Sequence, residues 1–418
     1  MNSNNSNTLI KTAKDINHTL MTKRRSPFDQ RISAMNLSER WIDWNGYRTP
    51  EYYFDAFSEY MATRNACAVF DNSPMCKYRI KGKDTERMLN RMVTRDVAQQ
   101  GFNRVAYNVW CDDSGKVIDD GTLFRLSQDE FIIFCAEPAM DWFMLSAVGF
   151  ADIEITDESH NIAGLALQGP TSCALLKALN ITDVELLKPF DIGNFNLETQ
   201  SGIVELMISR TGFTGDLGYE LWVDPSNAIA LWDILFSKGD LYGIQPLGDE
   251  PLGVARLEAG FLLPELEFHG ALHTVNLGFS QSPFELGLDW IVNFKKAHFN
   301  GRAALLKEKQ QGSKFKLTKL DIEGNKPADG SFLYSDKACT KEIGYVTSAA
   351  WSSALKQNIA YAFIKGDYVD GKSTKGKIWA EIYYQKELRW QHKIAECTVQ
   401  VGAFWAPKRA KQTPPPDC

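Results

Sequence analysis

The sequence predicts an α+β fold that ends in an all-β domain. Three observations support this prediction. Up to about residue 310, stretches with helical spacing of apolar residues alternate with strand-like stretches. Within this part, a strong β-hairpin signal runs from Val105 to Leu126. From Phe315 onward, short strand-like stretches alternate with turns, which is typical of a β-barrel or sandwich.

Length and composition limit the classes of protein to consider. The 418 residues suffice for two or three domains, and the net charge of -6 gives a nucleic-acid partner no electrostatic support. There is no run of eighteen apolar residues, so we expect no membrane-spanning helix. The first twenty-five residues lack the apolar centre of a signal peptide. We therefore expect a cytoplasmic protein with a disordered tail over residues 1–30 and a loose tail over residues 407–418.

Cysteine and histidine patterns indicate neither a disulfide framework nor a metal site. The eight cysteines are scattered and form no Cys-x-x-Cys pair, so we expect reduced thiols. His269 and His273 lie four residues apart, but nearby proline and glycine argue against a helix there and no third ligand is evident. No metal is expected.

The individual elements follow from periodicity, capping residues and turn residues. Helices are predicted at residues 51–64, 84–93, 139–146, 171–179 and 225–236. Strands are predicted at residues 77–80, 105–111, 116–126, 129–136, 163–168 and 219–223, and in the β-domain at 316–322, 343–348, 359–364 and 377–384.

The hairpin contains two adjacent acids, Asp119 and Asp120, which is unusual because aspartate is a poor strand former. With a four-residue loop at residues 112–115, Tyr107 would lie opposite Asp120 and Asn108 opposite Asp119. A loop longer by one residue would break this alignment. We expect Asp120 to face a cleft with Tyr107 beside it, and Asp119 to be a solvated or capping acid.

A second notable stretch contains Gly212, Gly215 and Gly218, whose spacing predicts a tight loop. The strand that follows places Glu220 on the face opposite to Tyr219. A carboxylate there can accept N–H bonds from a planar heterocycle in a cleft, although spacing alone favours a solvated Glu220 beside an ordinary turn.

The segment Ser209-Arg-Thr-Gly-Phe-Thr-Gly followed by Gly-Tyr-Glu resembles the signature of the folate-dependent aminomethyltransferase family. This family includes the glycine-cleavage T-protein, dimethylsulfoniopropionate demethylase and the folate domains of dimethylglycine and sarcosine dehydrogenases. The likeness extends over residues 37–405 and includes further family patterns at residues 68–75, 90–97, 166–170 and 282–292. At residues 90–97 the family commonly has Asn-Asp-Val.

The resemblance implies a three-domain, ring-like architecture with antiparallel sheets. Two interleaved α+β domains are expected over residues 31–310, and a C-terminal β-barrel or jelly-roll-like domain over residues 311–406. The absence of a dinucleotide-binding fingerprint argues against a fused flavin dehydrogenase.

The resemblance also implies tetrahydrofolate as the cofactor and a small methylated compound as the substrate. Asp120 stands at the position of the T-protein's catalytic acid, and Tyr107, at the position of a folate contact, is expected to act with it. The expected cofactor-binding residues are Glu220, Tyr107, Phe213, Trp290 and Met75. The expected substrate-binding residues are Arg256, Trp110 and Phe268. For Trp290, packing in the core is an equally good interpretation.

Two departures from the family pattern bear on the substrate. Leu252 stands where the T-protein pattern has an arginine associated with substrate and folate binding, and residues 261–269 replace the family's Tyr-Gly-Gln-Asp-Met. Arg256 and Glu258 are expected to pair near the cleft.

The leading hypothesis is a transferase that moves a methyl or methylene group from a small methylated amine or onium compound to tetrahydrofolate. The alternatives are a dimethylsulfoniopropionate-type demethylase that forms 5-methyltetrahydrofolate and a non-catalytic folate-binding protein. A homo-oligomer is left open.

Overall fold

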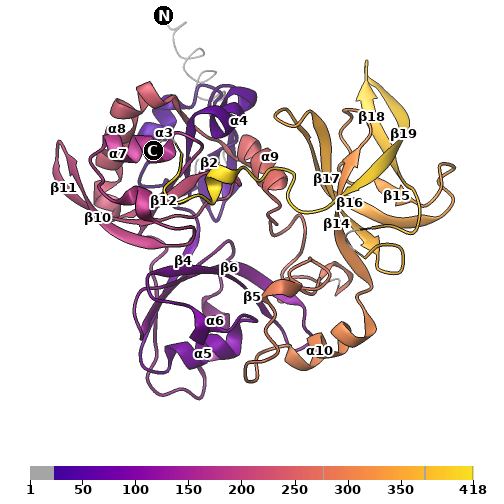
Figure 1. Ribbon diagram of the computed structural model, residues 1–418, viewed down its shortest axis with the longest axis horizontal. Helices are drawn as coiled ribbons and strands as arrows, with labels where there is room; N and C mark the ends of the chain where they lie inside the picture. Colours follow the sequence, from indigo (N-terminus) through magenta and orange to yellow (C-terminus); the bar gives the residue numbers. More distant parts are fainter. Residues whose placement is uncertain (1–22, 276, 371–372, 417) are drawn as a thin grey trace, which may run out of the picture.

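The computed structural model describes residues 23–275, 277–370, 373–416 and 418. Three lobes lie around a common centre (Figure 1). Two lobes each contain a sheet with helices, and the third is a closed six-stranded barrel. The predicted α+β fold with antiparallel sheets and a C-terminal barrel is confirmed; one short pairing, between β13 and β3, is parallel.

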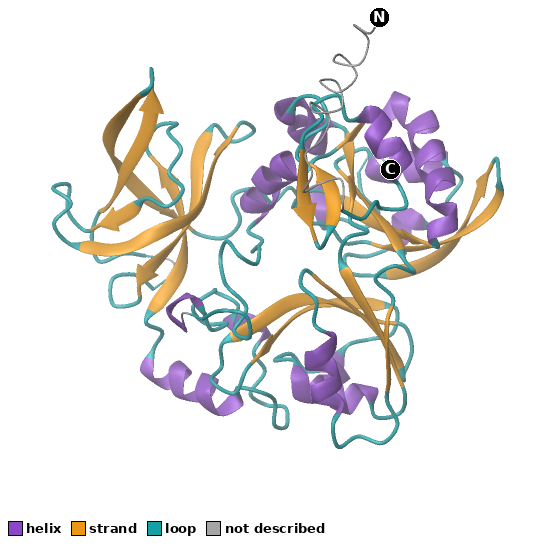
Figure 2. Ribbon diagram, turned by 180° about the vertical axis from the view of Figure 1, so that it is seen from behind, coloured by secondary structure: helices purple, strands orange, loops and turns teal. Residues whose placement is uncertain are grey.

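The first lobe is a six-stranded sheet covered on one face by helices (Figure 2). In spatial order its strands are β10 (Ile192–Thr199), β11 (Gly202–Ser209), β12 (Gly218–Val223), β9 (Ala163–Gln168), β3 (Cys67–Asp71) and β13 (Ile244–Pro246). Its helices are α3 (Asp29–Met35), α4 (Ala56–Asn65), α7 (Ser172–Ala178), α8 (Ala228–Gly239) and α9 (Asp249–Ala259), and a small ribbon is formed by β1 (Trp41–Trp44) and β2 (Tyr47–Pro50).

The second lobe is inserted between β3 and β9, so the chain leaves the first lobe and later returns to it. Its strands in spatial order are β5 (Arg104–Cys111), β6 (Val117–Arg125), β7 (Glu130–Cys135), β4 (Cys76–Lys81) and β8 (Glu154–Asp157). Helices α5 (Thr85–Met92) and α6 (Met140–Ala147) pack on one face through an apolar core that includes Leu89, Trp110 and Phe143.

The third lobe follows helix α10 (Arg302–Gln311). Its barrel is closed by β14 (Phe315–Ile322), β17 (Gln357–Lys365), β16 (Glu342–Ser352), β15 (Phe332–Tyr334), β18 (Ile378–Lys386) and β19 (Arg389–Gln400). The interior is filled by small and branched apolar side chains, among them Leu320, Ala362 and Ala380, so the barrel is a packed core.

The β5–β6 hairpin differs from the predicted register. Asp120 lies opposite Val109 rather than Tyr107. Pairing resumes only at Val117, so the loop is one residue longer than predicted and by itself would turn Asp120 to the other face. An irregularity next to the loop leaves Ile118 without a partner and restores the alternation. Tyr107 and Asp120 therefore share a face as diagonal neighbours.

A buried polar network joins the first lobe to the barrel. Arg64 of α4 donates two hydrogen bonds to Oε2 of Glu258 on α9, from Nη2 at 2.6 Å and from Nε at 3.0 Å. The hydroxyls of Tyr60 and of Ser352, on β16, donate to Oε1 of Glu258. The Arg64 and Glu258 side chains are 1% and 0% exposed, so the interaction is shielded from water.

After the barrel the chain crosses back to the first lobe as a strap, residues 405–416 and 418. Trp405 Nε1 donates to Asp216 at 3.0 Å, and Arg409 donates to both carboxylate oxygens of Asp216 at 2.7 and 2.8 Å. The expected loose tail over residues 407–418 is therefore wrong. The residues that hold this segment lie far from it in the sequence, so no local sequence pattern predicts that it is ordered.

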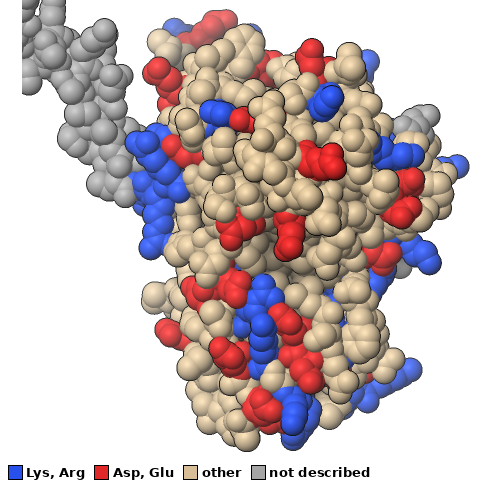
Figure 3. Space-filling model, turned by 90° about the vertical axis from the view of Figure 1, so that its left-hand side faces the viewer, with Lys and Arg blue, Asp and Glu red and all other residues tan. Residues whose placement is uncertain are grey.

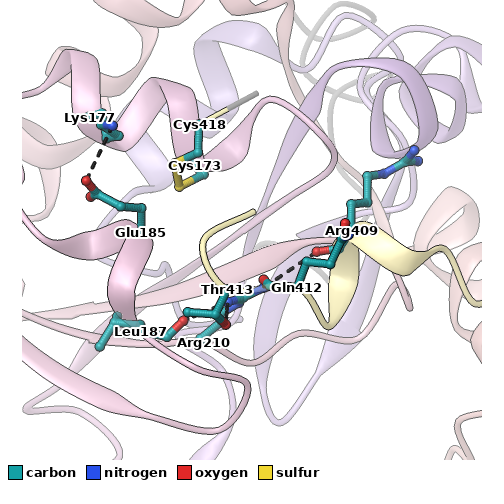
Figure 4. The surroundings of a disulfide bond; sticks show 9 residues. All are labelled: Cys173, Lys177, Glu185, Leu187, Arg210, Arg409, Gln412, Thr413 and Cys418. Carbon is teal, nitrogen blue, oxygen red and sulfur yellow. Dashed lines mark hydrogen bonds and ion pairs between the residues drawn. A yellow bond between two sulfur atoms is a disulfide. The ribbon is translucent and has the colours of Figure 1, made fainter. Parts of the chain in front are cut away.

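The end of the strap is fixed to the first lobe near Arg210 and Cys173 (Figure 4). Arg210 donates to the carbonyl of Gln412 at 2.5 Å and to the hydroxyl of Thr413 at 2.7 Å. Cys418 forms a disulfide with Cys173 of α7, 245 residues away. The expectation that all thiols are reduced is wrong for this pair, while the other six cysteines are free.

At the N-terminal end, the expected tail extends too far. Residues 1–22 lie outside the described part, but Phe28 is fully buried against the ring of Trp232 and α3 begins at Asp29. Arg48 fixes this helix through two hydrogen bonds of 2.7 Å to Asp29.

Among the described residues, no helix has the length and apolar character needed to cross a membrane. On the face drawn in Figure 3, acidic and basic side chains are interspersed.

Candidate functional site

Tyr107 and Asp120 lie on the sheet face of the second lobe that points away from α5 and α6. Strand neighbours alternate between faces. Trp110 points to the helices, where its ring lies 5.8 Å from that of Phe143. Tyr107 and Asp120 have the opposite facing and share it with Phe124 of β6, because residues two apart on a strand lie on one face.

Glu220 lies on the matching face of the first lobe. Its neighbours Tyr219 and Leu221 are fully buried in the core beneath the helices, so Glu220 and Trp222 point the other way. The Trp222 ring lies 4.3 Å from that of Phe134 on β7. The sheet face that carries Glu220 therefore packs against the sheet face that carries Asp120.

The acid on β6 is held by the tyrosine on β5. The Tyr107 hydroxyl donates a hydrogen bond to Oδ2 of Asp120. Burial raises the pKa of Asp120 to about 6, against the smaller lowering effect of the Tyr107 hydrogen bond. Desolvation disfavours a charged carboxylate, which is the physical cause of this shift. Asp120 is therefore poised to titrate near neutral pH.

Asp119 has a different environment from the one expected. It is 2% exposed, so it is not solvated. Its Oδ1 accepts the backbone N–H of Asp120 at 2.8 Å, and its Oδ2 accepts that of Glu137 at 3.4 Å, so the capping role is correct. Burial, followed by repulsion from Asp120, raises the pKa of Asp119 well above its usual value. A protonated Asp119 allows Asp120 to carry the negative charge.

Glu220 has one engaged oxygen and one available oxygen. Its Oε2 accepts the hydroxyl of Thr211 at 2.5 Å and that of Ser209 at 3.3 Å. None of the residues that the structure describes donates to Oε1. Burial raises the pKa of Glu220. Glu220 is half-buried rather than solvated, and Oε1 is free to accept an N–H group.

The Gln168 side chain leaves no room for a Cβ atom at two positions of the glycine loop, Gly212 and Gly218. A Cβ at Gly212 would lie 1.9 Å from the Gln168 amide oxygen, and one at Gly218 would lie 2.4 Å from its side chain. The amide donates to the carbonyls of Thr211 and Tyr219 at 3.3 and 3.4 Å. The tight loop is thus built around a buried amide, which also fixes the segment that carries Thr211.

Aromatic rings flank both acids. Trp290, on the 3-10 helix η6 (Asp289–Ile291), is 64% exposed, so it is not a core residue. Its ring stacks on Tyr107 with centroids 6.4 Å apart. Phe213 of the glycine loop stacks on Phe261 at 5.4 Å. Met75 contacts the apolar cluster around Trp222, between the two sheets. The contacts of Trp290, Phe213 and Met75 with a cofactor stay predictions.

The predicted substrate residues lie elsewhere, in packed interiors. Trp110 is 1% exposed on the helix side of its sheet, and Phe268 is 1% exposed in an apolar core shared with the barrel. Arg256 is 3% exposed and pairs with Glu267 at 2.7 Å. It does not pair with Glu258, because residues two apart on a helix do not face each other. The expected Arg256–Glu258 pair is therefore wrong, while substrate binding by Trp110, Phe268 and Arg256 stays a prediction.

Sequence reasoning missed the partners of Glu220. Ser209 lies directly opposite Glu220 on β11, and Thr211 follows two residues later. Both stand in the Ser-Arg-Thr signature, so the signal was present, but only the strand pairing shows that their hydroxyls meet the carboxylate. Reasoning from sequence also gave no role to Arg95, whose guanidinium carbon lies 5.2 Å from the centroid of the Trp290 ring.

Two surface hollows lie away from these acids, and the described residues form no metal-ligand group beside them. Among the residues described, no group of three His, Cys, Asp or Glu side chains could hold a metal ion. A hollow of about 470 Å³ lies on the barrel beside Trp351, and one of about 320 Å³ lies beside α10 and Lys307. Neither is lined by Tyr107, Asp120 or Glu220.

Comparisons with known proteins agree with this geometry. Residues 33–296 match the family model described as the GCVT N-terminal domain, and residues 316–382 match the glycine cleavage T-protein C-terminal barrel domain. An aminomethyltransferase of Caldanaerobacter subterraneus subsp. tengcongensis is 35% identical over 362 residues, covering 83% of this chain and 93% of the relative. One of Halothermothrix orenii is 33% identical over 344 residues, covering 82% and 91%.

A solved structure shows the same fold. The glycine cleavage system aminomethyltransferase T from Bartonella henselae superimposes with a TM-score of 0.77 over 92% of this chain and 98% of the other, at 22% identity. The family and the transferase class that the sequence patterns predicted are thus confirmed. With two domain models matched in order and relatives aligned over most of its length, the chain belongs to the glycine cleavage T-protein family of aminomethyltransferases.

Proposed function

We propose that this protein is a tetrahydrofolate-dependent one-carbon transferase whose donor is a small methylated amine or onium compound. The observation that carries the proposal is the Tyr107–Asp120 pair on one sheet face and Glu220 on the face packed against it. Relatives named aminomethyltransferase, at 33% and 35% identity, support it.

The residues present suit a reduced pterin. Oε1 of Glu220 is an acceptor for the N–H edge of a heterocycle, and its half-buried setting strengthens such a bond. The rings of Phe213 and Trp290 offer apolar faces for stacking. Tetrahydrofolate, when bound, supplies the nitrogen that receives the one-carbon unit.

Asp120 is the residue with the properties of an acid–base or electrostatic group. Its pKa of about 6 keeps it mostly ionised at neutral pH, yet close enough to neutrality to take up a proton. As a carboxylate it can stabilise positive charge on a methylated amine or onium centre. Tyr107 fixes its orientation through the hydroxyl bond to Oδ2.

A small free donor fits better than one carried on a protein. Leu252 replaces the arginine of the T-protein pattern, and it packs against an apolar cluster in the first lobe. The stacked rings of Tyr107 and Trp290 beside a carboxylate suit a compact organic cation. The cytoplasmic location and a homo-oligomer stay predictions.

A donor panel tests the proposal. The purified protein is incubated with tetrahydrofolate and, separately, methylated amines, betaines and sulfonium compounds, and the folate products are quantified by mass spectrometry. We expect methyl- or methylene-tetrahydrofolate from at least one amine or onium donor. Folate binding without product from any donor would overturn transfer in favour of a binding protein. Product from dimethylsulfoniopropionate alone would assign the protein to the demethylase class.

A further inference from the structure

Arg95 is a half-buried arginine that has no anionic partner among the residues that the structure describes. Its guanidinium contacts the ring of Trp290, with 5.2 Å between Cζ and the ring centroid. Within the described part of the chain, no carboxylate forms an ion pair with Arg95, and its buried Nε has no hydrogen-bond partner. Desolvation lowers the pKa of Arg95, with no neighbouring acid to oppose this effect. A partly desolvated guanidinium without an acceptor is costly unless a ligand supplies one.

The backbone that carries Arg95 is firmly held. Lys296 donates to the carbonyls of Arg95 at 2.7 Å and of Asn90 at 2.6 Å, beyond the end of α5. The N–H of Thr94 donates to the carbonyl of Val109 on β5 at 3.0 Å. The segment therefore continues the sheet edge next to the strand of Tyr107. The side chain of Arg95 therefore extends from a fixed backbone position.

The neighbours of Arg95 place it at the proposed reaction site. Trp290 contacts Arg95 and also stacks on Tyr107, whose hydroxyl binds Asp120. A cationic side chain and an anionic one thus flank the same pair of rings.

We propose that Arg95 binds a carboxylate of one of the two reactants in the one-carbon transfer. The planar guanidinium presents paired N–H donors that match a carboxylate in geometry and charge. One source is the methyl donor itself: an N-methylated amino acid carries a cation for Asp120 and a carboxylate for Arg95. The other source is the glutamyl end of tetrahydrofolate. The inference rests on the proposed function, because it assigns a role within the same site.

The test compares wild type, Arg95→Gln and Arg95→Lys with the control Arg87→Gln. Arg87 lies on the neighbouring helix α5 but is 73% exposed and paired with Asp84. Equilibrium binding is measured for tetrahydrofolate and for tetrahydropteroate, which lacks the glutamyl carboxylates. Steady-state KM is measured for methylated amines with and without a carboxylate.

If the carboxylate belongs to folate, Arg95→Gln weakens tetrahydrofolate binding roughly tenfold to a hundredfold and leaves tetrahydropteroate unchanged. If the carboxylate belongs to the methyl donor, Arg95→Gln leaves the affinities for tetrahydrofolate and tetrahydropteroate unchanged. The KM then rises roughly tenfold to a hundredfold, and only for donors that carry a carboxylate. Arg95→Lys should recover part of either loss. Unchanged affinities and KM values in Arg95→Gln, even with a lowered melting temperature, overturn this inference alone. A wild-type protein that binds no folate overturns the proposed function as well.

Discussion

The Tyr107 hydroxyl binds Asp120 although the two residues do not lie opposite each other in the hairpin. Thr122 lies opposite Tyr107, and Val109 lies opposite Asp120. Diagonal neighbours on one face of an antiparallel pair remain within reach of a long side chain such as tyrosine. The Tyr107 ring also stacks on the ring of Trp290. Tyr107 therefore links the carboxylate of Asp120 to the exposed aromatic side chain of Trp290.

Replacing Asp120 with asparagine should remove catalysis and spare folate binding. The amide keeps the shape and can still accept the Tyr107 hydroxyl, but it carries no charge and takes up no proton. We expect kcat to fall by about 10²–10⁴-fold, the usual contribution of a general acid or base, with folate affinity unchanged. Single-turnover kinetics and equilibrium binding measure the two quantities. Asp113→Asn, in the exposed loop of the same hairpin, is the control and should behave as wild type.

The pH dependence of kcat should show an acidic limb near pH 6. Burial raises the pKa of Asp120 to about 6, so the carboxylate is lost as the pH falls through this value, well above the range of an ordinary aspartate. Activity that needs the carboxylate therefore rises with pH through about 6 and then levels off. Because Asp119 interacts with Asp120, the limb belongs to the pair. An acidic limb that persists unchanged in Asp120→Asn would contradict this assignment.

Glu220→Gln should weaken folate binding more than it slows the chemical step. Glutamine can still accept one hydrogen bond but loses the charge that strengthens it, and its amide group would meet the Thr211 hydroxyl. We expect the dissociation constant to rise roughly tenfold to a hundredfold. Glu205→Gln, on an exposed position of the neighbouring strand β11, is the matched control. Equal effects in both variants would show that net charge, not a specific contact, is responsible.

The hairpin shows how far the sequence could lead. Alternation and the adjacent acids correctly placed Tyr107 and Asp120 on one face, yet the predicted register was wrong. The loop is one residue longer than predicted, which alone would turn Asp120 to the other face of the sheet. The unpaired Ile118 shifts the register back by one residue, so Asp120 keeps the predicted face. Neither has a local sequence signal, so the correct pairing of Tyr107 with Asp120 needed the family pattern or the structure.

Contacts between distant segments were beyond the sequence. The Cys173–Cys418 disulfide and the bonds from the strap to Asp216 join residues that no periodicity relates. The expected pairing of Arg256 with Glu258 was wrong for the same reason, since its partner Glu267 follows a loop of irregular structure. Local rules predict elements and their faces, whereas the choice of partner for a charged side chain depends on the tertiary arrangement.

The strap should stabilise the glycine loop. Cys418→Ser, or reduction of the disulfide, releases the end that Arg210 and Cys173 hold in the first lobe. A disulfide typically contributes about 2–4 kcal/mol to stability. We expect a lower melting temperature and faster amide hydrogen exchange over residues 209–217, measured by mass spectrometry. Cys339→Ser, which removes a free thiol on the barrel, should change neither.

The buried network around Glu258 gives the sharpest stability prediction. Glu258→Gln removes the carboxylate that accepts two hydrogen bonds from Arg64 and leaves Asp216, at 3.9 Å, as the remaining ion-pair partner of Arg64. Removing one partner of a buried pair typically costs about 3–5 kcal/mol. Because the network joins α4, α9 and β16, the first lobe and the barrel should separate more easily, and limited proteolysis between them should accelerate. The exposed pair of Arg31 and Asp233, 2.6 Å apart, is the contrast: Asp233→Asn should leave the melting temperature nearly unchanged, since solvent screens that interaction. Equal losses in the two variants would show that burial of the Arg64–Glu258 pair does not hold the lobes together.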